Sequence, residues 1–157
     1  SFSSASYGEA LGLDSRRSDI EGLKNVYLYL VAAVCAVVER ERMFDPENQQ
    51  LISSLADVAI EIFAAESVFL RVSKGLSNRS MDGMELYEDL EKIYFVRAVD
   101  RIRQEVNEIL ATLFTGPKLA EKLGELDAWL PLPVGLIEDR ARVARVLLQG
   151  GGLPVFV

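Results

Sequence analysis

Apolar residues recur along most of the chain at spacings of three and four, the period of a helix with one face turned to a core. Short breakers rich in glycine, proline and polar residues interrupt this pattern, and no period-two alternation is long enough for a strand. The pattern predicts helices over about 20–42, 46–74, 84–114 and 134–149, with a shorter one before the last. We predict an all-α fold, an up-and-down bundle of three long helices followed by two shorter C-terminal helices.

Three segments differ in their periodicity. Residues 1–19 show little periodic hydrophobicity and are predicted to be a linker or docking segment, residues 20–152 the helical bundle domain, and residues 153–157 a tail. Asp45 and Pro46 supply a cap and a first-turn proline for the second helix. The stretch 75–83, rich in Gly, Ser and Asn, predicts the turn before the third helix, and the glycines 150–152 are expected to end the last one.

The first helix is apolar on two sides. One stripe consists of Leu23, Tyr27, Leu30, Val31, Val34 and Val38, and the far side carries Val26, Leu28, Ala32, Ala33, Ala36 and Val37. A helix at the edge of a bundle needs only one such face. Two interpretations follow: a central helix of the bundle, or a docking surface for another domain or a second subunit.

The other helices have a single apolar stripe. On the third helix it consists of Phe95, Ala98, Val99, Ile102, Val106, Ile109, Leu110 and Leu113, and on the fourth of Leu119, Leu123, Leu126 and Leu130. On the last helix we expect Ile137, Ala141, Ala144 and Leu148 to face inward, and Glu138, Asp139, Arg142 and Arg145 to face solvent.

The apolar face of the second helix consists of Leu51, Leu55, Ala59, Ile62, Phe69 and Leu70. One carboxylate, Glu66, falls on this face, close in angle to Leu55. A buried carboxylate needs a fixed partner or belongs to a site. If the second and third helices are antiparallel about a turn near residue 78, Lys92 lies level with Glu66. The sequence therefore predicts an ion pair between Glu66 and Lys92.

Composition narrows the classes of function. The chain has no histidine and therefore lacks the commonest general base and metal ligand. Its formal charge of −7 makes a nucleic-acid partner unexpected, because binding to phosphates needs clustered Lys and Arg. The single cysteine, Cys35, is predicted to be a buried thiol. The charge-free run Val26 to Val38 spans 13 residues, short of the roughly 20 of a membrane helix. We expect no membrane partner and a cytoplasmic location.

A metal or proton-transfer site is the alternative for the acidic residues. An all-carboxylate metal site would draw on Glu66, Glu88 and Glu91. Di-metal centres in helix bundles use Glu-x-x-His pairs, which this chain does not contain. We therefore assign no catalytic, cofactor-binding or metal-binding residue.

Three segments together resemble a known family: LADVAIEIFAAESVFLRVSK (55–74), KIYFVRAVDRI (92–102) and PLPVGLIEDRARVARVLLQGGG from Pro131. They are similar, in order and spacing, to the extra C-terminal helical domain of long acyl-CoA dehydrogenases, both bacterial and of the very-long-chain type. The resemblance covers about residues 20–152. It implies a non-catalytic domain that packs against the catalytic domains of its parent chain and shapes subunit contacts, including those of a homodimer.

The resemblance also implies where the chemistry lies. The parent enzyme would bind FAD and oxidise fatty acyl-CoA to the 2-enoyl-CoA, with its catalytic glutamate in upstream domains. We expect no cofactor in this chain and no catalysis by it alone. The alternative is a stand-alone helical module that binds a partner or a small ligand, with no enzyme attached.

Overall fold

The protein is described here by a computed structural model, which covers residues 4–38, 46–77 and 84–149. The elements are α1 (Ser4–Val38), α2 (Pro46–Ser77), α3 (Met84–Leu113), α4 (Gly116–Asp127) and α5 (Ile137–Leu148). No strand occurs in these three ranges. The predicted all-α fold of three long and two short helices is confirmed.

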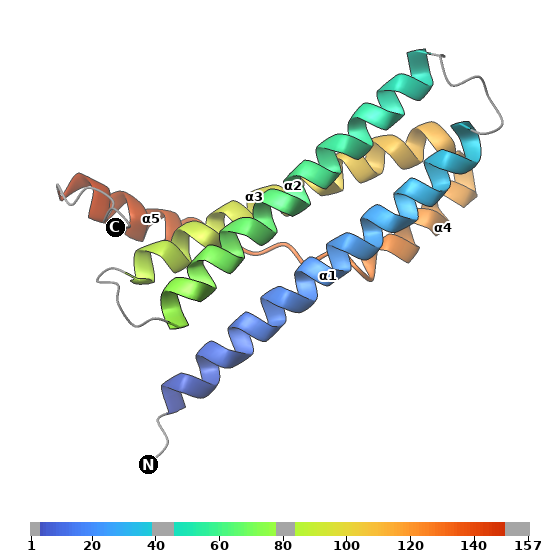
Figure 1. Cartoon of the computed structure of the whole chain (residues 1–157). Helices are drawn as coiled ribbons and strands as arrows, with labels where there is room; N and C mark the ends of the chain where they lie inside the picture. Colours follow the sequence, from blue (N-terminus) through green and yellow to red (C-terminus); the bar gives the residue numbers. More distant parts are fainter. Residues whose placement is uncertain (1–3, 39–45, 78–83, 150–157) are drawn as a thin grey trace.

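The helices form a bundle around α3 (Figure 1). Helices α2 and α3 lie side by side as an antiparallel hairpin, and α1 packs against both. Helix α4 folds back beside the C-terminal end of α3, and the segment that follows α4 returns towards the other end of α3, where α5 begins. The chain therefore visits both ends of α3 after leaving it.

The core consists of the apolar stripes that face α3. On α3 the predicted stripe is buried from Phe95 to Leu110, with Leu113 half-buried. It meets Leu23, Val26, Leu30 and Val34 of α1, Leu51, Leu55, Val58, Ile62, Ala65 and Phe69 of α2, and Leu126 of α4. Because these positions recur every three or four residues, the pattern predicted most of them.

Helix boundaries differ from the predicted ones by three residues or more at three places. Helix α1 begins at Ser4, so residues 4–19 of the predicted linker are helical. Helix α2 ends at Ser77, so residues 75–77 of the predicted turn are helical, and α5 begins at Ile137, three residues later than predicted. Pro131 and Pro133 lie in the connection before α5. The end predicted for the first helix near residue 42, the cap at Asp45, most of the turn predicted at 75–83, the glycines 150–152 and the tail 153–157 lie outside the described residues.

A tight turn reverses the chain between α3 and α4. Thr115 is extended, Gly116 has a φ of 58°, and Pro117 stands in the first turn of α4. Positive φ is sterically costly for residues with a Cβ, and proline is well suited to a helix start. The sequence Thr-Gly-Pro thus encodes the reversal locally.

The connection between α4 and α5 is held against two helices. The Trp129 ring lies edge-on to Tyr29 of α1, with centroids 6.4 Å apart. Arg103 of α3 forms an ion pair with Asp127 at 2.8 Å and donates a hydrogen bond to the Pro131 carbonyl at 3.1 Å. These contacts hold in place a connection that is neither helix nor strand between residues 131 and 136.

We predict that Gly22→Ala destabilises the bundle. A Cβ at position 22 would stand 2.5 Å from the Trp129 carbonyl oxygen, a backbone atom that cannot move away without shifting the connection. We expect the free energy of unfolding to fall by about 1–3 kcal/mol, measured by chemical denaturation. Gly124→Ala is the matched control: it adds a methyl group to open space and should stabilise the helix by about 0.5–1 kcal/mol. Equal stabilisation by both substitutions would contradict the prediction.

Candidate functional site

Glu66 pairs with α1 and not with α3. Lys24 Nζ lies 2.8 Å from Glu66 Oε1, and both side chains remain about one-third exposed. The hydrogen bond to Glu66 is the largest contribution that raises the pKa of Lys24. The predicted pair of Glu66 with Lys92 is therefore wrong.

The error has a geometric cause. The buried stripe of α2 is centred on Val58, Ala65 and Phe69, whereas Leu70, which the pattern placed on that stripe, is 53% exposed. This shift moves Glu66 to the flank that faces α1. The register estimate used for the second hairpin, applied to the predicted break at 43–45, places Glu66 level with Gly22, two residues from Lys24.

Lys92 belongs instead to an ion-pair network that attaches α5 to α3. Lys92 Nζ lies 2.8 Å from Asp139 Oδ2. Arg142 bridges Asp139 at 2.7 Å and Asp89 at 2.6 Å, and it donates to both Asp89 oxygens. Asp139 and Asp89 are buried, at 4% and 8% exposure. Two buried carboxylates and two cations thus form the charged α3–α5 contact.

This network reverses the orientation predicted for α5. Asp139 and Val143 are buried, while the four residues expected to face inward are exposed: Ile137 (85%), Ala141, Ala144 and Leu148 (87%). The predicted inward side is therefore wrong, because Asp139 and Arg142 have specific partners on α3, which periodicity alone does not reveal. Of the four residues expected to face solvent, Glu138, Arg142 and Arg145 are exposed, whereas Asp139 is buried. A sequence feature that could have indicated this arrangement is the spacing of Asp139 and Arg142. Residues three apart are neighbours on a helix surface, so the two side chains form a charged pair there.

A second ion-pair cluster joins the N-terminal part of α1 to α3. Arg16 lies 3.0 Å from Glu91 and 3.3 Å from Asp19, and its guanidinium stands 3.8 Å from the centre of the Phe95 ring. Burial raises the pKa of Glu91 and of Asp19, and Arg16 opposes both shifts. The two carboxylates therefore share one partly buried cation.

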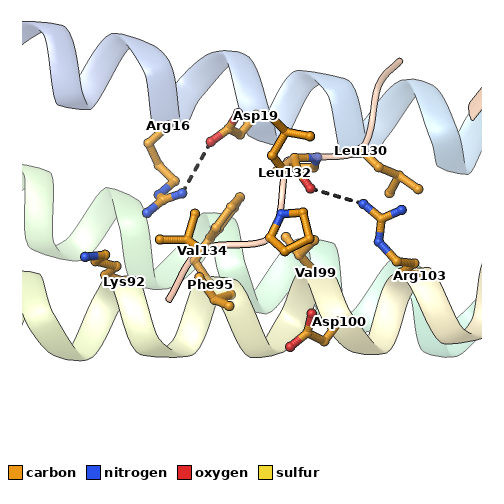
Figure 2. Close-up of a pocket in the computed structure, with 13 residues that line it drawn as sticks. Arg16, Asp19, Lys92, Phe95, Val99, Asp100, Arg103, Leu130, Leu132 and Val134 are labelled. Atoms are coloured by element: carbon orange, nitrogen blue, oxygen red, sulfur yellow. Dashed lines mark hydrogen bonds and ion pairs between the residues drawn. The ribbon is translucent and has the colours of Figure 1, made fainter. Parts of the chain in front are cut away.

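A cleft of about 390 Å³ lies between α1, α3 and the segment Leu130 to Val134 (Figure 2). Arg16 and Asp19 border it from α1, and Lys92, Phe95 and Val99 from α3. A more open groove of about 610 Å³ lies between α2 and α3, with mostly apolar walls that include Phe63, Tyr87 and Tyr94. The cleft offers charged groups, whereas the groove offers an apolar surface.

Two apolar stripes start from the Lys24–Glu66 pair and run in the same direction. On α1 they continue through Leu28, Val31 and Cys35, and on α2 through Phe63, Ala59, Ala56 and Ile52. Each step of three or four residues stays on one side of a helix. Leu28, Phe63 and Ile52 are 63%, 72% and 45% exposed. We refer to these seven residues as the α1–α2 face, and none of them is charged.

Cys35 is exposed on this face, so the prediction of a buried thiol is wrong. Within the described residues, one helical stretch, Asp14–Val38, is long and apolar enough to cross a membrane by length and composition, as core helices of other proteins also are. Only 28% of its most apolar window is buried in the bundle. Much of the apolar surface of α1 is therefore accessible to a partner.

Comparison with known families gives a match over residues 23–126. The matching family is described as acyl-CoA dehydrogenase, C-terminal domain. The chain belongs to this family. The match begins in α1 and ends at Leu126, the buried residue of α4, so it covers the bundle core and leaves out α5. The resemblance stated from the sequence is confirmed.

The fold is also found in a solved structure. The crystal structure of an acyl-CoA dehydrogenase complexed with FAD from Bacillus anthracis superposes with a TM-score of 0.75 at 18% identity. The alignment covers 89% of this chain and 24% of that one, so the chain spans about a quarter of the length of that protein. No curated protein sequence gives a significant match to the chain.

The cations that border the cleft are engaged by carboxylates of the chain itself: Arg16 by Asp19 and Glu91, Lys92 by Asp139, and Arg103 by Asp127. Glu66 and Glu91, considered above for a metal site, are held by cations on α1. The described part of the chain contains no group of three or more acidic or thiol side chains that could hold a metal ion.

We predict a small coupling energy between Lys24 and Glu66. In a double-mutant cycle of Lys24→Met and Glu66→Gln, thermal unfolding should give a coupling of about 0.3–1 kcal/mol, because the pair is partly exposed. Lys92→Met combined with Glu66→Gln is the control and should be additive. Coupling in the control but not in the first cycle would contradict this assignment.

We predict that acid loosens α5 through Asp139. The hydrogen bond from Lys92, followed by the charges of Lys92 and Arg142, holds the pKa of Asp139 below its ordinary value of 3.8. A lowered pKa stabilises the folded state above pH 3.8, and this contribution is lost as the pH falls through the folded value. Asp139→Asn should lower hydrogen-exchange protection of α5 about tenfold near neutral pH. In the variant, the hydrogen-exchange protection of α5 should also depend less on pH. Protection equal to that of the unmodified protein would contradict the prediction.

Proposed function

We propose that this chain is a non-catalytic C-terminal domain of an FAD-dependent acyl-CoA dehydrogenase that oxidises fatty acyl-CoA to the 2-enoyl-CoA. The family match over residues 23–126 carries the proposal. The solved relative, whose chain is about four times as long as the matched part, supports a large remainder that includes the FAD site. The base and the flavin ligands would belong to that remainder.

The domain packs against the catalytic domains of its parent chain through the α1–α2 face. An exposed apolar surface without charge is costly in water, and burying it stabilises a contact by about 25 cal/mol for each Å² removed from solvent. The ion pair of Lys24 and Glu66 borders this face, where a polar rim of a domain contact is expected. In this proposal, the docking surface expected on the first helix binds the catalytic domains of the parent chain.

The same proposal includes subunit contacts in a homodimer, a cytoplasmic location, and the absence of a nucleic-acid or membrane partner. The stand-alone helical module is the second candidate, and the groove between α2 and α3 is the feature that favours it. A module of that kind would be encoded without an acyl-CoA dehydrogenase core before residue 1.

We predict that charges on the α1–α2 face detach the domain in the full-length protein. Leu28→Lys together with Ile52→Lys, two positions of this face that do not line the groove between α2 and α3, should separate the thermal unfolding of the full-length enzyme into two transitions, because a lysine cannot be buried unpaired at an apolar contact. Ser53→Lys with Asp57→Lys, exposed positions of α2 outside this face, is the control and should leave one transition.

The full-length protein also tests the activity. It should carry bound flavin, visible in its absorbance spectrum, and oxidise a fatty acyl-CoA, while the 157-residue chain alone should do neither. A full-length protein without flavin and without this activity would overturn the proposed function. A single transition in the lysine variant would overturn only the choice of surface.

A further inference from the structure

Helix α5 exposes an apolar stripe although it is firmly attached. Its polar side is bound to α3 by Lys92, Asp89, Asp139 and Arg142, so its orientation is set by specific contacts. The outward stripe consists of Ile137, Ala141, Ala144 and Leu148, spaced by four, three and four residues. This spacing is that of a helix seam that packs against another helix.

The order of residue sizes along the stripe is symmetric: large, small, small, large. When two copies of α5 pack antiparallel about a two-fold axis, Ile137 of one lies opposite Leu148 of the other, and Ala141 lies opposite Ala144. The small residues at the centre allow the helices to approach closely, and the large ones close the two ends. A two-fold contact requires this self-complementarity, because the same patch serves both subunits.

The charges on one flank of the stripe are complementary in the same arrangement, and the other flank carries Arg140 and Leu147. Glu138 and Arg145 occupy the same flank of the stripe, one beside Ile137 and the other beside Ala144. An antiparallel pairing places Glu138 of each copy opposite Arg145 of the other, which gives two symmetric ion pairs. Both side chains are exposed, and no described residue of the same chain forms an ion pair with either. In a parallel pairing this flank would face the opposite flank of the partner helix, so Glu138 and Arg145 would not meet.

We propose that α5 is a self-association surface, which pairs antiparallel with α5 of a second copy of this chain. The inference deepens the subunit contact of the proposed function by naming its surface, but it does not depend on the identity of the parent enzyme. Each α5 is 12 residues or about 18 Å long. The contact alone is therefore small beside a stable interface, and we expect weak, concentration-dependent association.

Disulfide trapping in the 157-residue chain tests the geometry. With the native thiol removed by Cys35→Ser, one preparation carries Ala141→Cys and a second carries Ala144→Cys. Mixing them under mild oxidation should trap a mixed dimer at least tenfold faster than either preparation alone, because only positions 141 and 144 face each other. Glu108→Cys mixed with Ala111→Cys, an exposed pair of equal spacing on α3, is the control.

Charge exchange tests the partner separately. Glu138→Arg added to both chains should slow trapping about tenfold, since it places two arginines opposite each other twice, and Arg145→Glu should do the same with glutamates. Glu138→Arg on one chain mixed with Arg145→Glu on the other restores two ion pairs and should restore the rate to within about twofold. These substitutions are exposed, and circular dichroism of each variant verifies its fold.

The outcomes are decisive. Trapping no faster than the control, equal trapping of 141 with 141, or charge exchange without recovery would each overturn the antiparallel pairing. None of these results would bear on flavin binding or activity of the full-length protein, so failure of this inference is distinguishable from failure of the proposed function.

Discussion

Burial of the apolar stripe of α3 is the constraint on which the rest of the structure depends. From Phe95 to Leu110 this stripe faces α1, α2 and α4 in turn, and α3 packs against each of the other four helices. Removing so much apolar surface from water is the main source of stability in a bundle of this size. The other four helices pack over α3. The sides of these helices that face away from α3 are therefore the surfaces left exposed.

Charged residues then decide how the covering helices are oriented. At the N-terminal half of α3, where the apolar stripe is incomplete, Arg16 joins α1 to Glu91, and Lys92 and Asp89 hold α5. Burial raises the pKa of Glu91, whereas the hydrogen bond from Lys92 lowers that of Asp139. Protonation of Glu91 in acid therefore favours the folded state, because desolvation dominates the pKa of this carboxyl. Protonation of Asp139 disfavours the folded state, because the cation Lys92 dominates its pKa.

Two apolar surfaces remain after the core is formed, and they differ in kind. The α1–α2 face is broad, lies across two helices and ends at an ion pair, which suits contact with another domain. The stripe of α5 is one helix wide and symmetric in size and charge, which suits a second copy of itself. This domain thus has room for both an intramolecular and an intermolecular contact on separate surfaces.

The sequence by itself determined the helices and the residues that line α3, because a period of three to four residues depends only on local geometry. It also carried the resemblance to the family. Only the tertiary structure decided which cation meets Glu66, which side of α5 faces the bundle, and that Cys35 is exposed. Periodicity locates the centre of an apolar face to within about one residue, and a side chain at its edge, such as Glu66, changes neighbour with a shift of that size. The partners Lys24, Lys92 and Asp139 come together across helices far apart in sequence, so their pairing depends on packing that no local pattern encodes.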